Sequence, residues 1–355
     1  MKRNLTGKLI SIAMSALLTL SVFSGCTDSG SSVPSDSSAP ESSGEISAQE
    51  SSEEVSAEKT VVNVAALKGP TGLGITYLME QDEQGTTAND YEFTLAGAAD
   101  EVLAKVISGE VDIAAVPTNA ASILYHKTEK NVSVLALNTL GVLHILQIGD
   151  EVSSVADLQG KTIYSSGQGA VPEYALNYIL TRNGLTPGED VTVEWKTEHS
   201  ENAAQMVAGQ VSLCMVPEPF VTQITSKNPD VKIALDLTKE WDKVAENGAA
   251  LTMGCMIVRN DFLEEHPDAV SAFMEEYKAS VEYVNANPHE AGIISEKYDI
   301  LAADVAEKAI PNCNIVYIDG EEMQSALSGF LQVLYDANPQ AVGGSLPDEA
   351  FYYKK

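Results

Sequence analysis

AKVISGEVDIAAVPTNAA, at Ala104 to Ala121, is nearly repeated one hundred residues later as AQMVAGQVSLCMVPEPFV, at Ala204 to Val221. Ala, Gly, Val, Val and Pro are identical at positions 104/204, 109/209, 111/211, 116/216 and 117/217, and most other positions keep their apolar or polar character. Because the offset is the same at every position, the match indicates an internal repeat. The chain therefore contains two halves of similar construction.

Each copy has the pattern of a helix followed by a strand. Its apolar residues first fall at helical spacing, a Gly then permits the left-handed turn that ends a helix, and a short apolar run follows. Pro ends this strand and starts the next helix. Upstream of the copies, VVNVAALKGPTG and KTIYSSGQGAVP both predict a strand, a Gly-rich loop and a helix. Since loops after parallel strands gather at one sheet edge, the two halves can face each other and enclose a ligand.

The composition is that of a folded, acidic protein. The chain has 355 residues, of which 44% are hydrophobic, enough for two domains with cores of their own. Its 51 acidic and 21 basic residues give a formal net charge of -30, which opposes binding to phosphate backbones and to anionic lipid. Nucleic-acid binding is therefore not expected, and the acidic surface mainly favours solubility.

The first residues of the chain predict export. MKRNLTGKLISIAMSALLTLSVFSGC places three basic residues before an apolar run, Leu9 to Phe23, that ends in small residues at Cys26. The run is too short and too often interrupted by Ser and Thr for a membrane span, so residues 1–26 are typical of a signal peptide. FSGC resembles the lipobox of bacterial lipoproteins, in which the Cys becomes the lipidated first residue. The resemblance implies a lipid anchor on Cys26 at the outer face of the cell membrane.

Residues 27–59 are rich in Ser and acidic residues and contain no aromatic residue. No core can form from this composition, and its like charges favour an extended chain. We expect a disordered tether with an r.m.s. reach on the order of 30 Å between the lipid and the folded part.

Three cysteines remain beyond Cys26. Cys214 and Cys255 lie in apolar, strand-like runs, which predicts buried free thiols. Cys313 lies in a loop, and no pattern supports a disulfide bridge from it.

Strands and helices alternate along the folded part, which begins at Thr60, and this alternation predicts parallel sheets with right-handed crossovers. VSVLALNTLGVLHILQIGD predicts two strands around Gly141, the second of which crosses to the other half. ALTMGCMIVRNDFL predicts a strand that returns to the first half. The rest of the chain has helical apolar spacing, with stops at Pro288, Pro311 and Pro339.

Four segments together resemble a known family. The order VADLQGKTIYSSGQG, ILTRNGLTPGEDV, AAQMVAGQVSLCMVPEPF and IVRNDFLEEHPDAVSAFM is similar to that of the solute-binding proteins of ABC transporters in the nitrate, sulfonate, taurine and thiamine-precursor class. The resemblance covers about residues 60–299 and implies an α/β, two-lobed type II periplasmic-binding-protein fold, each lobe a mostly parallel sheet flanked by helices. Lobe one would comprise residues 60–150 and 250–355, and lobe two residues 151–249.

Motifs of catalysis are weak or absent in the sequence. GKT in QGKTIY lacks the first Gly of a phosphate-binding loop and lies between a helix and a strand instead of the reverse. GQG at Gly167 to Gly169 lacks the third Gly and the acidic partner of a dinucleotide fingerprint. The five His residues show no metal-ligand spacing, and no GxSxG motif occurs. We therefore expect no enzymatic activity, no cofactor and no metal.

The candidate ligand site lies in the two Gly-rich loops and at the Pro-ended strands of the repeat. Both loops put small residues before a helix start, where free backbone N–H groups and the helix dipole favour an anionic or strongly polar group. The family resemblance also places the PEPF segment in the cleft of lobe two. The predicted ligand-binding residues are Lys68, Gly69, Pro70, Thr71, Gly72, Thr118, Asn119, Ser165, Ser166, Gly167, Gln168, Gly169, Glu218 and Phe220.

Several of these residues also have a purely structural interpretation. The Gly-rich loops can be simple tight turns, and Lys68 can be a solvated lysine beside one of them. Glu218 can accept a hydrogen bond from an amine or ring N–H of the ligand, or it can cap the following helix. His144 is expected to be a partly buried histidine and not a ligand contact.

The family resemblance implies the extracytoplasmic substrate-binding component of an ABC importer. Such a protein captures a small polar or anionic solute between its lobes, which close on it, and delivers it to a membrane permease driven by a separate ATPase subunit. Two alternatives stay open at this stage. One is a thiamine-pyrimidine-related enzyme of the same fold, and the other is an ectodomain that senses a solute without transporting it.

Overall fold

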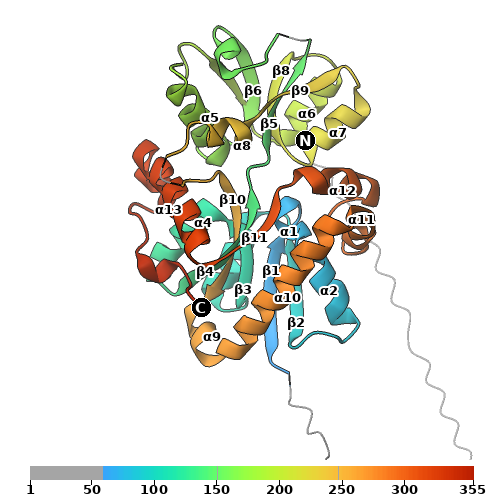
Figure 1. Cartoon of the computed structure of the whole chain (residues 1–355), viewed down its shortest axis with the longest axis vertical. Coiled ribbons are helices and arrows are strands. Elements are labelled where there is room, and N and C mark those ends of the chain that lie inside the picture. Colours follow the sequence, from blue (N-terminus) through green and yellow to red (C-terminus); the bar gives the residue numbers. More distant parts are fainter. Residues whose placement is uncertain (1–58, 150, 247) are drawn as a thin grey trace, which may run out of the picture. The chain divides into compact units, whose positions relative to one another are not determined.

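The computed structural model describes residues 59–149, 151–246 and 248–355 (Figure 1). The predicted signal peptide, the lipidation of Cys26 and nearly all of the predicted tether lie outside the described residues. None of the helices in these three ranges combines the length and the apolar character needed to span a bilayer.

The folded body contains two sheets, each flanked by helices (Figure 1). The first sheet has, in spatial order, β11 (Ile315–Ile318), β4 (Val132–Leu140), β10 (Thr252–Arg259), β3 (Ile113–Pro117), β1 (Val61–Leu67) and β2 (Asp90–Ala96). The second sheet has, in spatial order, β7 (Thr192–Lys196), β6 (Thr162–Ser166), β8 (Leu213–Pro217), β5 (Leu143–Ile148) and β9 (Val231–Asp236).

Both sheets are mostly parallel, as predicted. In the first sheet β1, β2, β3 and β4 run in one direction, and β10 and β11 run in the other. In the second sheet β5 runs against the other four strands. The chain enters the second sheet in β5 and returns to the first in β10. The antiparallel strands in the interior of the sheets are therefore the two crossing strands.

Helices connect most of these strands. They are α1 (Pro70–Leu73), α2 (Thr76–Glu83), α3 (Ala99–Ser108), α4 (Thr118–Lys127), α5 (Val171–Arg182), α6 (His199–Val207), α7 (Phe220–Lys227), α8 (Leu237–Asp242), α9 (Asn260–Glu265), α10 (Pro267–Ala286), α11 (Pro288–Lys297), α12 (Ala303–Ala309) and α13 (Gly320–Ala337). Short 3-10 helices are η1 (Val155–Leu158), η2 (Ile310–Asn312), η3 (Pro339–Val342) and η4 (Glu349–Phe351).

The repeat forms the same unit in both sheets. The first copy is α3, β3 and α4, and the second copy is α6, β8 and α7. Gly109 follows α3 with a φ of 80°, and Gly209 ends the turn after α6 with a φ of 68°. These positive φ angles are easily adopted by Gly, which explains why both copies have Gly between the helix and the strand.

The boundary between the two sheets differs from the predicted lobe boundary at one point. We expected lobe one to extend to residue 150, but β5 pairs with β8 and β9 and so belongs to the second sheet. The chain crosses at Gly141, where an added Cβ would lie only 2.2 Å from Thr238 Oγ1. The second strand of the run around Gly141 does cross to the other half, as predicted, so the difference is confined to the numerical boundary. The return at β10 begins at Thr252, close to the predicted residue 250.

The C-terminal part contains the predicted long helices and one strand that we did not predict. The edge strand β11 has four residues and pairs antiparallel with β4. A run of this length is too short to show an alternating pattern. Cys214 and Cys255 are buried free thiols, as predicted, and Cys313 is also buried and free.

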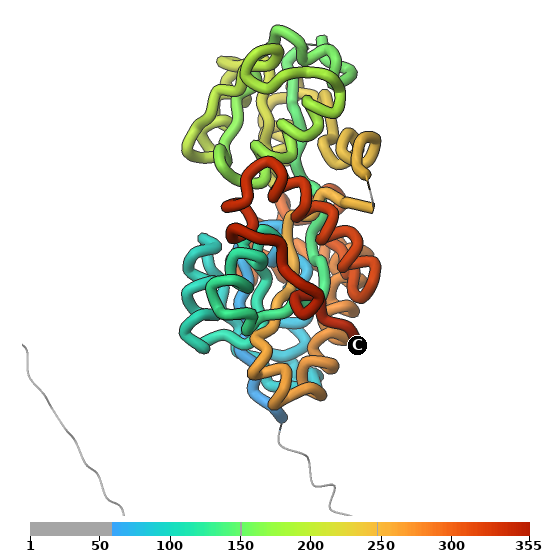
Figure 2. Tube along the Cα trace, turned by 90° about the vertical axis from the view of Figure 1, so that its left-hand side faces the viewer, coloured from blue at the N-terminus to red at the C-terminus, as the bar shows by residue number. Residues whose placement is uncertain are grey.

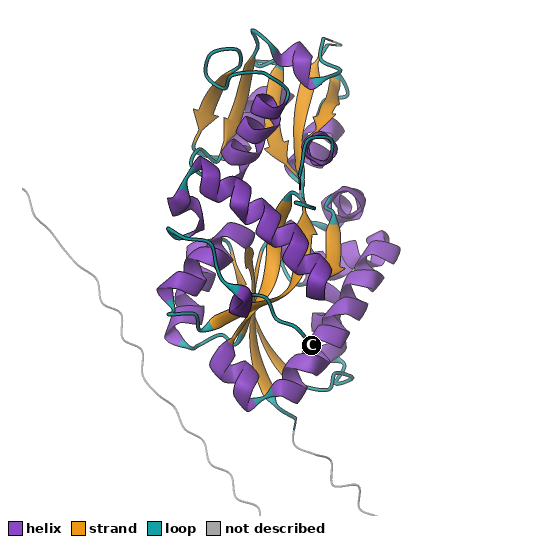
Figure 3. Cartoon of the chain, turned by 60° about the vertical axis from the view of Figure 1, so that its left-hand side comes forward, coloured by secondary structure: helices purple, strands orange, loops and turns teal. Residues whose placement is uncertain are grey.

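The last long helix joins the two lobes at a second place (Figure 2). α13 packs on β4 of the first sheet and on α5, which covers the second sheet. Asn338, just after α13, donates from Nδ2 to the hydroxyl oxygen of Tyr174 on α5 at 3.0 Å. Trp241 of α8 is fully buried, and its ring centroid lies 5.7 Å from that of Phe330 on α13 and 4.6 Å from that of Tyr178 on α5. Figure 3 shows both sheets with these helices on either side.

Candidate ligand-binding site

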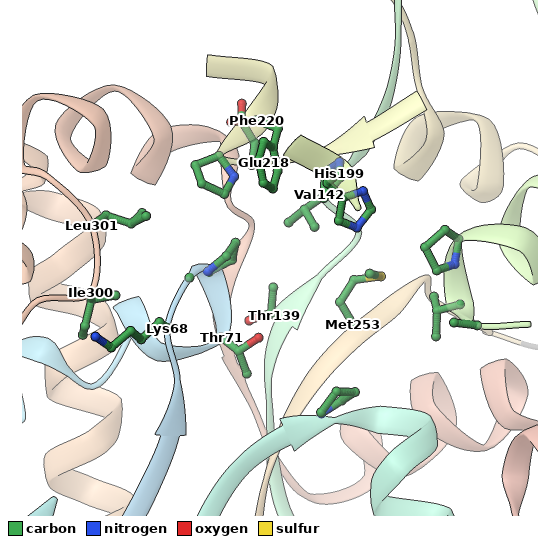
Figure 4. A pocket seen from close by; sticks show the side chains of 18 of the residues that line it. Lys68, Thr71, Thr139, Val142, His199, Glu218, Phe220, Met253, Ile300 and Leu301 are labelled. Carbon is green, nitrogen blue, oxygen red and sulfur yellow. The ribbon is translucent and has the colours of Figure 1, made fainter. Parts of the chain in front are cut away.

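A cavity of about 590 Å³ lies between the two sheets, where strands of both lobes end (Figure 4). Its lining residues on the first lobe are Lys68, Gly69, Pro70, Thr71, Pro117, Asn119, Thr139, Met253, Ile300 and Leu301. Its lining residues on the second lobe and at the crossing are Val142, Ala170, Val171, Pro172, His199, Pro217, Glu218, Pro219, Phe220 and Gln223. Because both lobes contribute, any movement of one lobe relative to the other changes the cavity.

The first Gly-rich loop forms one wall of the cavity. Pro70 starts α1, and the N–H groups of Gly72 and Leu73 donate back to the carbonyl oxygen of Gly69 at 3.0 and 3.1 Å. Gly72 does not line the cavity, and a Cβ there would lie 2.1 Å from the carbonyl oxygen of Leu67. Its small size instead allows α1 to pack on the end of β1. Lys68 forms an ion pair with Asp299 across the rim.

Two threonines lie together at the floor of the cavity (Figure 4). A Cβ added to Gly254 would lie 2.9 Å from Thr71 Cγ2 and 3.4 Å from Thr139 Oγ1, so the missing side chain of Gly254 makes room for both. Thr139 is 1% exposed, and its Oγ1 has no hydrogen-bond partner among the described residues. An unpaired buried hydroxyl costs stability, so a ligand group that reached this oxygen would gain a hydrogen bond that the free protein lacks.

Glu218 lines the second lobe's side of the cavity but directs its hydrogen bonds elsewhere. Its Oε2 accepts from the backbone N–H of Thr222 at 3.1 Å, and its Oε1 accepts from Thr222 Oγ1 at 3.1 Å. Burial raises the pKa of the Glu218 carboxyl, against the lowering effect of the two bonds from Thr222. The following peptide bond, to Pro219, is cis. Of the two interpretations of Glu218, these bonds are those of a helix cap for α7.

His199 is a cavity residue that the sequence analysis missed. It is the first residue of α6, its Nδ1 lies 2.5 Å from Ser166 Oγ, and its ring centroid lies 5.6 Å from that of Phe220. Burial lowers the pKa of His199, which keeps the imidazole neutral at pH 7. No local signal marked His199, because the equivalent residue of the first copy, Ala99, does not line the cavity.

The second Gly-rich loop turns its glycines away from the cavity. The N–H of Gly169 donates to Glu173 Oε2 at 2.6 Å, and that of Ala170 donates to the carbonyl oxygen of Gly167 at 3.1 Å. Gly167 and Gln168 line a separate hollow beside Trp195. The residues of this loop that reach the cavity are Ala170, Val171 and Pro172.

The structure brings half of the predicted site residues to the cavity. These are Lys68, Gly69, Pro70, Thr71, Asn119, Glu218 and Phe220, whereas Gly72, Thr118, Ser165, Ser166, Gly167, Gln168 and Gly169 do not line it. Thr118 is buried and donates to the carbonyl oxygen of Thr252 at 3.1 Å, and Ser165 is buried and donates to that of Met215 at 3.1 Å. His144 is a buried histidine, as expected, and it too lies outside the lining. Across the described residues, no group of three or more His, Cys, Asp or Glu is placed to hold a metal ion.

Two mostly parallel sheets with a cavity between their strand ends define a type II periplasmic-binding-protein fold. A family model described as NMT1/THI5-like matches residues 90–291, more than half of the chain, and the chain therefore belongs to this family. The prediction of the family and of the fold is thus confirmed. No curated protein matches the chain.

Solved structures of low sequence identity share the fold. An ABC transporter structure from Parabacteroides distasonis is 24% identical with a TM-score of 0.71, over 84% of this chain and 100% of that chain. The periplasmic aliphatic sulphonate-binding protein SsuA from Escherichia coli is 12% identical with a TM-score of 0.67, over 84% and 93%. The periplasmic nitrate-binding protein NrtA from Synechocystis PCC 6803 is 13% identical with a TM-score of 0.55, over 82% and 83%.

Proposed function

We propose that the chain is the extracytoplasmic substrate-binding component of an ABC importer. The observation that carries this proposal is the cavity of about 590 Å³, which is lined by facing strand ends and helix starts of two lobes. This is the size and position of a site for one small solute. Membership of the NMT1/THI5-like family and the fold shared with sulphonate-binding and nitrate-binding proteins support the proposal. The partners are a membrane permease and its separate ATPase subunit.

Ligand capture in this proposal is a shift between open and closed arrangements. A solute that contacts Thr71 and Thr139 on one lobe and Phe220 on the other favours the arrangement in which all three are within reach. The moving bodies are residues 60–141 with 252–355, and residues 142–249, because the sheets divide there. The permease then recognises the closed arrangement.

Binding without chemical turnover is part of the same proposal. Of the titratable groups on the cavity wall, Glu218 is bonded to Thr222 and His199 to Ser166, while Lys68 is paired with Asp299. Ser166 and His199 are within hydrogen-bond distance of each other, but the hydroxyl of Ser166 is buried and does not line the cavity, so it is not placed to attack a bound solute. Chemical change in a solute after long incubation with the pure protein would favour the enzyme alternative.

We also propose that the protein is exported and held at the outer face of the membrane by a lipid on Cys26, with residues 27–59 as the tether. The basic residues, the apolar run and the FSGC sequence support this arrangement. A Cys26→Ser variant should fold normally and no longer partition with membranes. Its recovery in the membrane fraction would contradict lipidation.

A solute screen tests the function directly. Sulfonates, nitrate, pyrimidines and amino-acid-like zwitterions are tested for thermal stabilisation, and a true ligand at a hundredfold excess over its dissociation constant adds about 2.7 kcal/mol to the free energy of unfolding. Small-angle scattering should show compaction with the same ligand. A protein that no solute stabilises or compacts would not be a solute receptor.

A further inference from the structure

The charges at the cavity wall are already paired within the protein. Lys68 is the single Lys or Arg of the described lining, and it forms an ion pair with the exposed side chain of Asp299. The two arginines of the described ranges, Arg182 and Arg259, pair with acidic residues elsewhere and do not line the cavity. A buried oxyanion would therefore find no guanidinium group and no free ammonium group on this wall.

The helix starts around the cavity are also poor anion sites. Pro70 starts α1, Pro172 lies in the first turn of α5, and Pro219 directly precedes α7. A proline has no backbone N–H, so each helix start has one donor fewer.

Carboxylates of the protein occupy the neighbouring donors of the second lobe. Glu173 accepts from the N–H of Gly169 at 2.6 Å, and Glu218 accepts from the N–H of Thr222 at 3.1 Å. Of these two carboxylates, Glu218 lines the cavity, so an anionic solute would meet it where the N-terminus of α7 would otherwise attract an anion.

The remaining wall is mainly apolar. The side chains that give it this character are Val142, Val171, Phe220, Met253, Ile300 and Leu301. They come from both lobes, so they can enclose the body of a solute and remove its apolar surface from water.

The floor of the cavity provides one polar end. Thr139 Oγ1 is buried without a partner, and Thr71 lies beside it. A hydroxyl group both donates and accepts a hydrogen bond, so it suits an amide or a hydroxyl group of a ligand without requiring charge.

We infer that the cavity takes an uncharged solute with an apolar body and one hydrogen-bonding end at Thr139 and Thr71, and that it disfavours oxyanions. This inference rests on the proposed function and narrows it. It narrows our sequence-based expectation of an anionic or strongly polar group at the Gly-rich loops to an uncharged polar group.

Three probes with the same ring and different heads test the charge preference. Benzamide, benzenesulfonate and benzylammonium are titrated into the wild-type protein by calorimetry. We expect benzamide to bind at least tenfold more tightly than either charged probe, because a charge would be buried without a free partner. Equal or tighter binding of benzenesulfonate or benzylammonium overturns the inference, and so does a failure of benzamide to bind.

Two matched variants test the polar end. Thr139→Val keeps the shape and removes the hydroxyl, and we expect about tenfold weaker benzamide binding with no loss of melting temperature in the free protein. Thr118→Val is the control, because its hydroxyl is bonded to the carbonyl oxygen of Thr252 and lies outside the lining. It should lower the melting temperature and leave the affinity unchanged. Unchanged affinity in Thr139→Val overturns the placement of the polar end.

A variant with an added positive charge tests the wall itself. Met253→Arg places a guanidinium group on the cavity wall, and we expect benzenesulfonate then to bind more tightly than benzamide. If the variant still binds benzamide more tightly than benzenesulfonate, as expected for the wild type, the charge of the wall does not select the ligand. That result contradicts the inference. If the proposed function itself is wrong, the result differs, because neither these probes nor any screened solute then binds.

Discussion

The two copies of the repeat differ in how they meet the cavity. In the first copy, α4 begins at Thr118, directly after β3, and the side chain of Thr118 bonds to β10 of its own lobe. In the second copy, α7 begins only at Phe220, because Glu218 folds back to cap it and Pro219 stands between them. The same strand and helix positions thus give the cavity Pro117 and Asn119 from the first copy, and Pro217, Glu218, Pro219, Phe220 and Gln223 from the second. A repeat can place the same strands and helices around a site in both lobes, while a few residues at one strand end determine which chemical groups the site presents.

The largest expected difference lies in the Gly-rich loops upstream of the two copies. Gly72→Ala should cost about 3 kcal/mol of the free energy of unfolding, because its Cβ would lie 2.1 Å from the backbone oxygen of Leu67. Gly169→Ala is the matched variant in the second lobe. It has a φ of 75° and open space around an added Cβ, so we expect a cost of about 1 kcal/mol. Denaturant unfolding measures both, and equal losses would show that the two loops are equally constrained.

The cap on α7 is the next test of the comparison. Glu218→Ala leaves the N–H and hydroxyl groups of Thr222 without their acceptor and should cost about 2 kcal/mol. Thr118→Ala, at the corresponding position of the first copy, removes the bond that Thr118 Oγ1 donates to the carbonyl oxygen of Thr252 and the bond that it accepts from Thr252 Oγ1. Because both bonds join neutral groups, this change should cost about 1 kcal/mol. Urea unfolding of the two variants shows which one loses more of the free energy of unfolding. The reverse order would mean that Glu218 is not a cap.

A smaller effect is expected where the second lobe holds His199. Ser166→Ala removes the hydroxyl that lies 2.5 Å from His199 Nδ1 and should cost about 1 kcal/mol of stability. It should also weaken ligand binding, because the ring on the cavity wall is then free to turn. Ser165→Ala is the control, since its hydroxyl bonds to Met215 and not to a lining residue. Calorimetry measures the ligand affinity of both variants. Equal affinities for Ser166→Ala and Ser165→Ala would contradict this role of Ser166.

The smallest effect is a pH dependence at Glu218. Because burial raises its pKa in the folded protein, the folded state holds the proton more tightly than the unfolded state does. The stability contributed by Glu218 is therefore full below its ordinary pKa of about 4.3 and declines as pH rises through the raised value. The Gln side chain of Glu218→Gln does not titrate. The melting temperature of this variant minus that of the wild type should therefore increase from pH 4 to pH 7. A constant difference over this interval would mean that the pKa is not raised.

The sequence predicted the fold because its signals were periodic and repeated. The one-hundred-residue offset and the Gly and Pro positions placed α3, β3, α6 and β8 correctly. The crossing of the chain in β5 was also predicted, but the lobe boundary was set at residue 150, after this strand, and not before it.

The site was predicted only in part, for a physical reason. A Gly-rich turn before a helix has the same composition whether its N–H groups are free or, as at Gly169, bonded to a nearby Glu173. Met253 and Ile300 reach the cavity through tertiary packing, and neither is part of a local pattern. The placement of Thr71 and Phe220 was possible because each lies where a strand end and a helix start meet.

The burial of Trp241 has an optical consequence. Its indole N–H donates to the carbonyl oxygen of Ala249, and its ring lies among aromatic rings of both lobes, so any rotation of one lobe against the other alters the surroundings of this fluorophore. The chain has two tryptophans, and the other, Trp195, lies on the second lobe beside Gly167 and Gln168. The fluorescence emission of Trp241 should therefore change when the angle between the lobes changes, without an added dye. Trp195, which lies on one lobe, provides an internal reference.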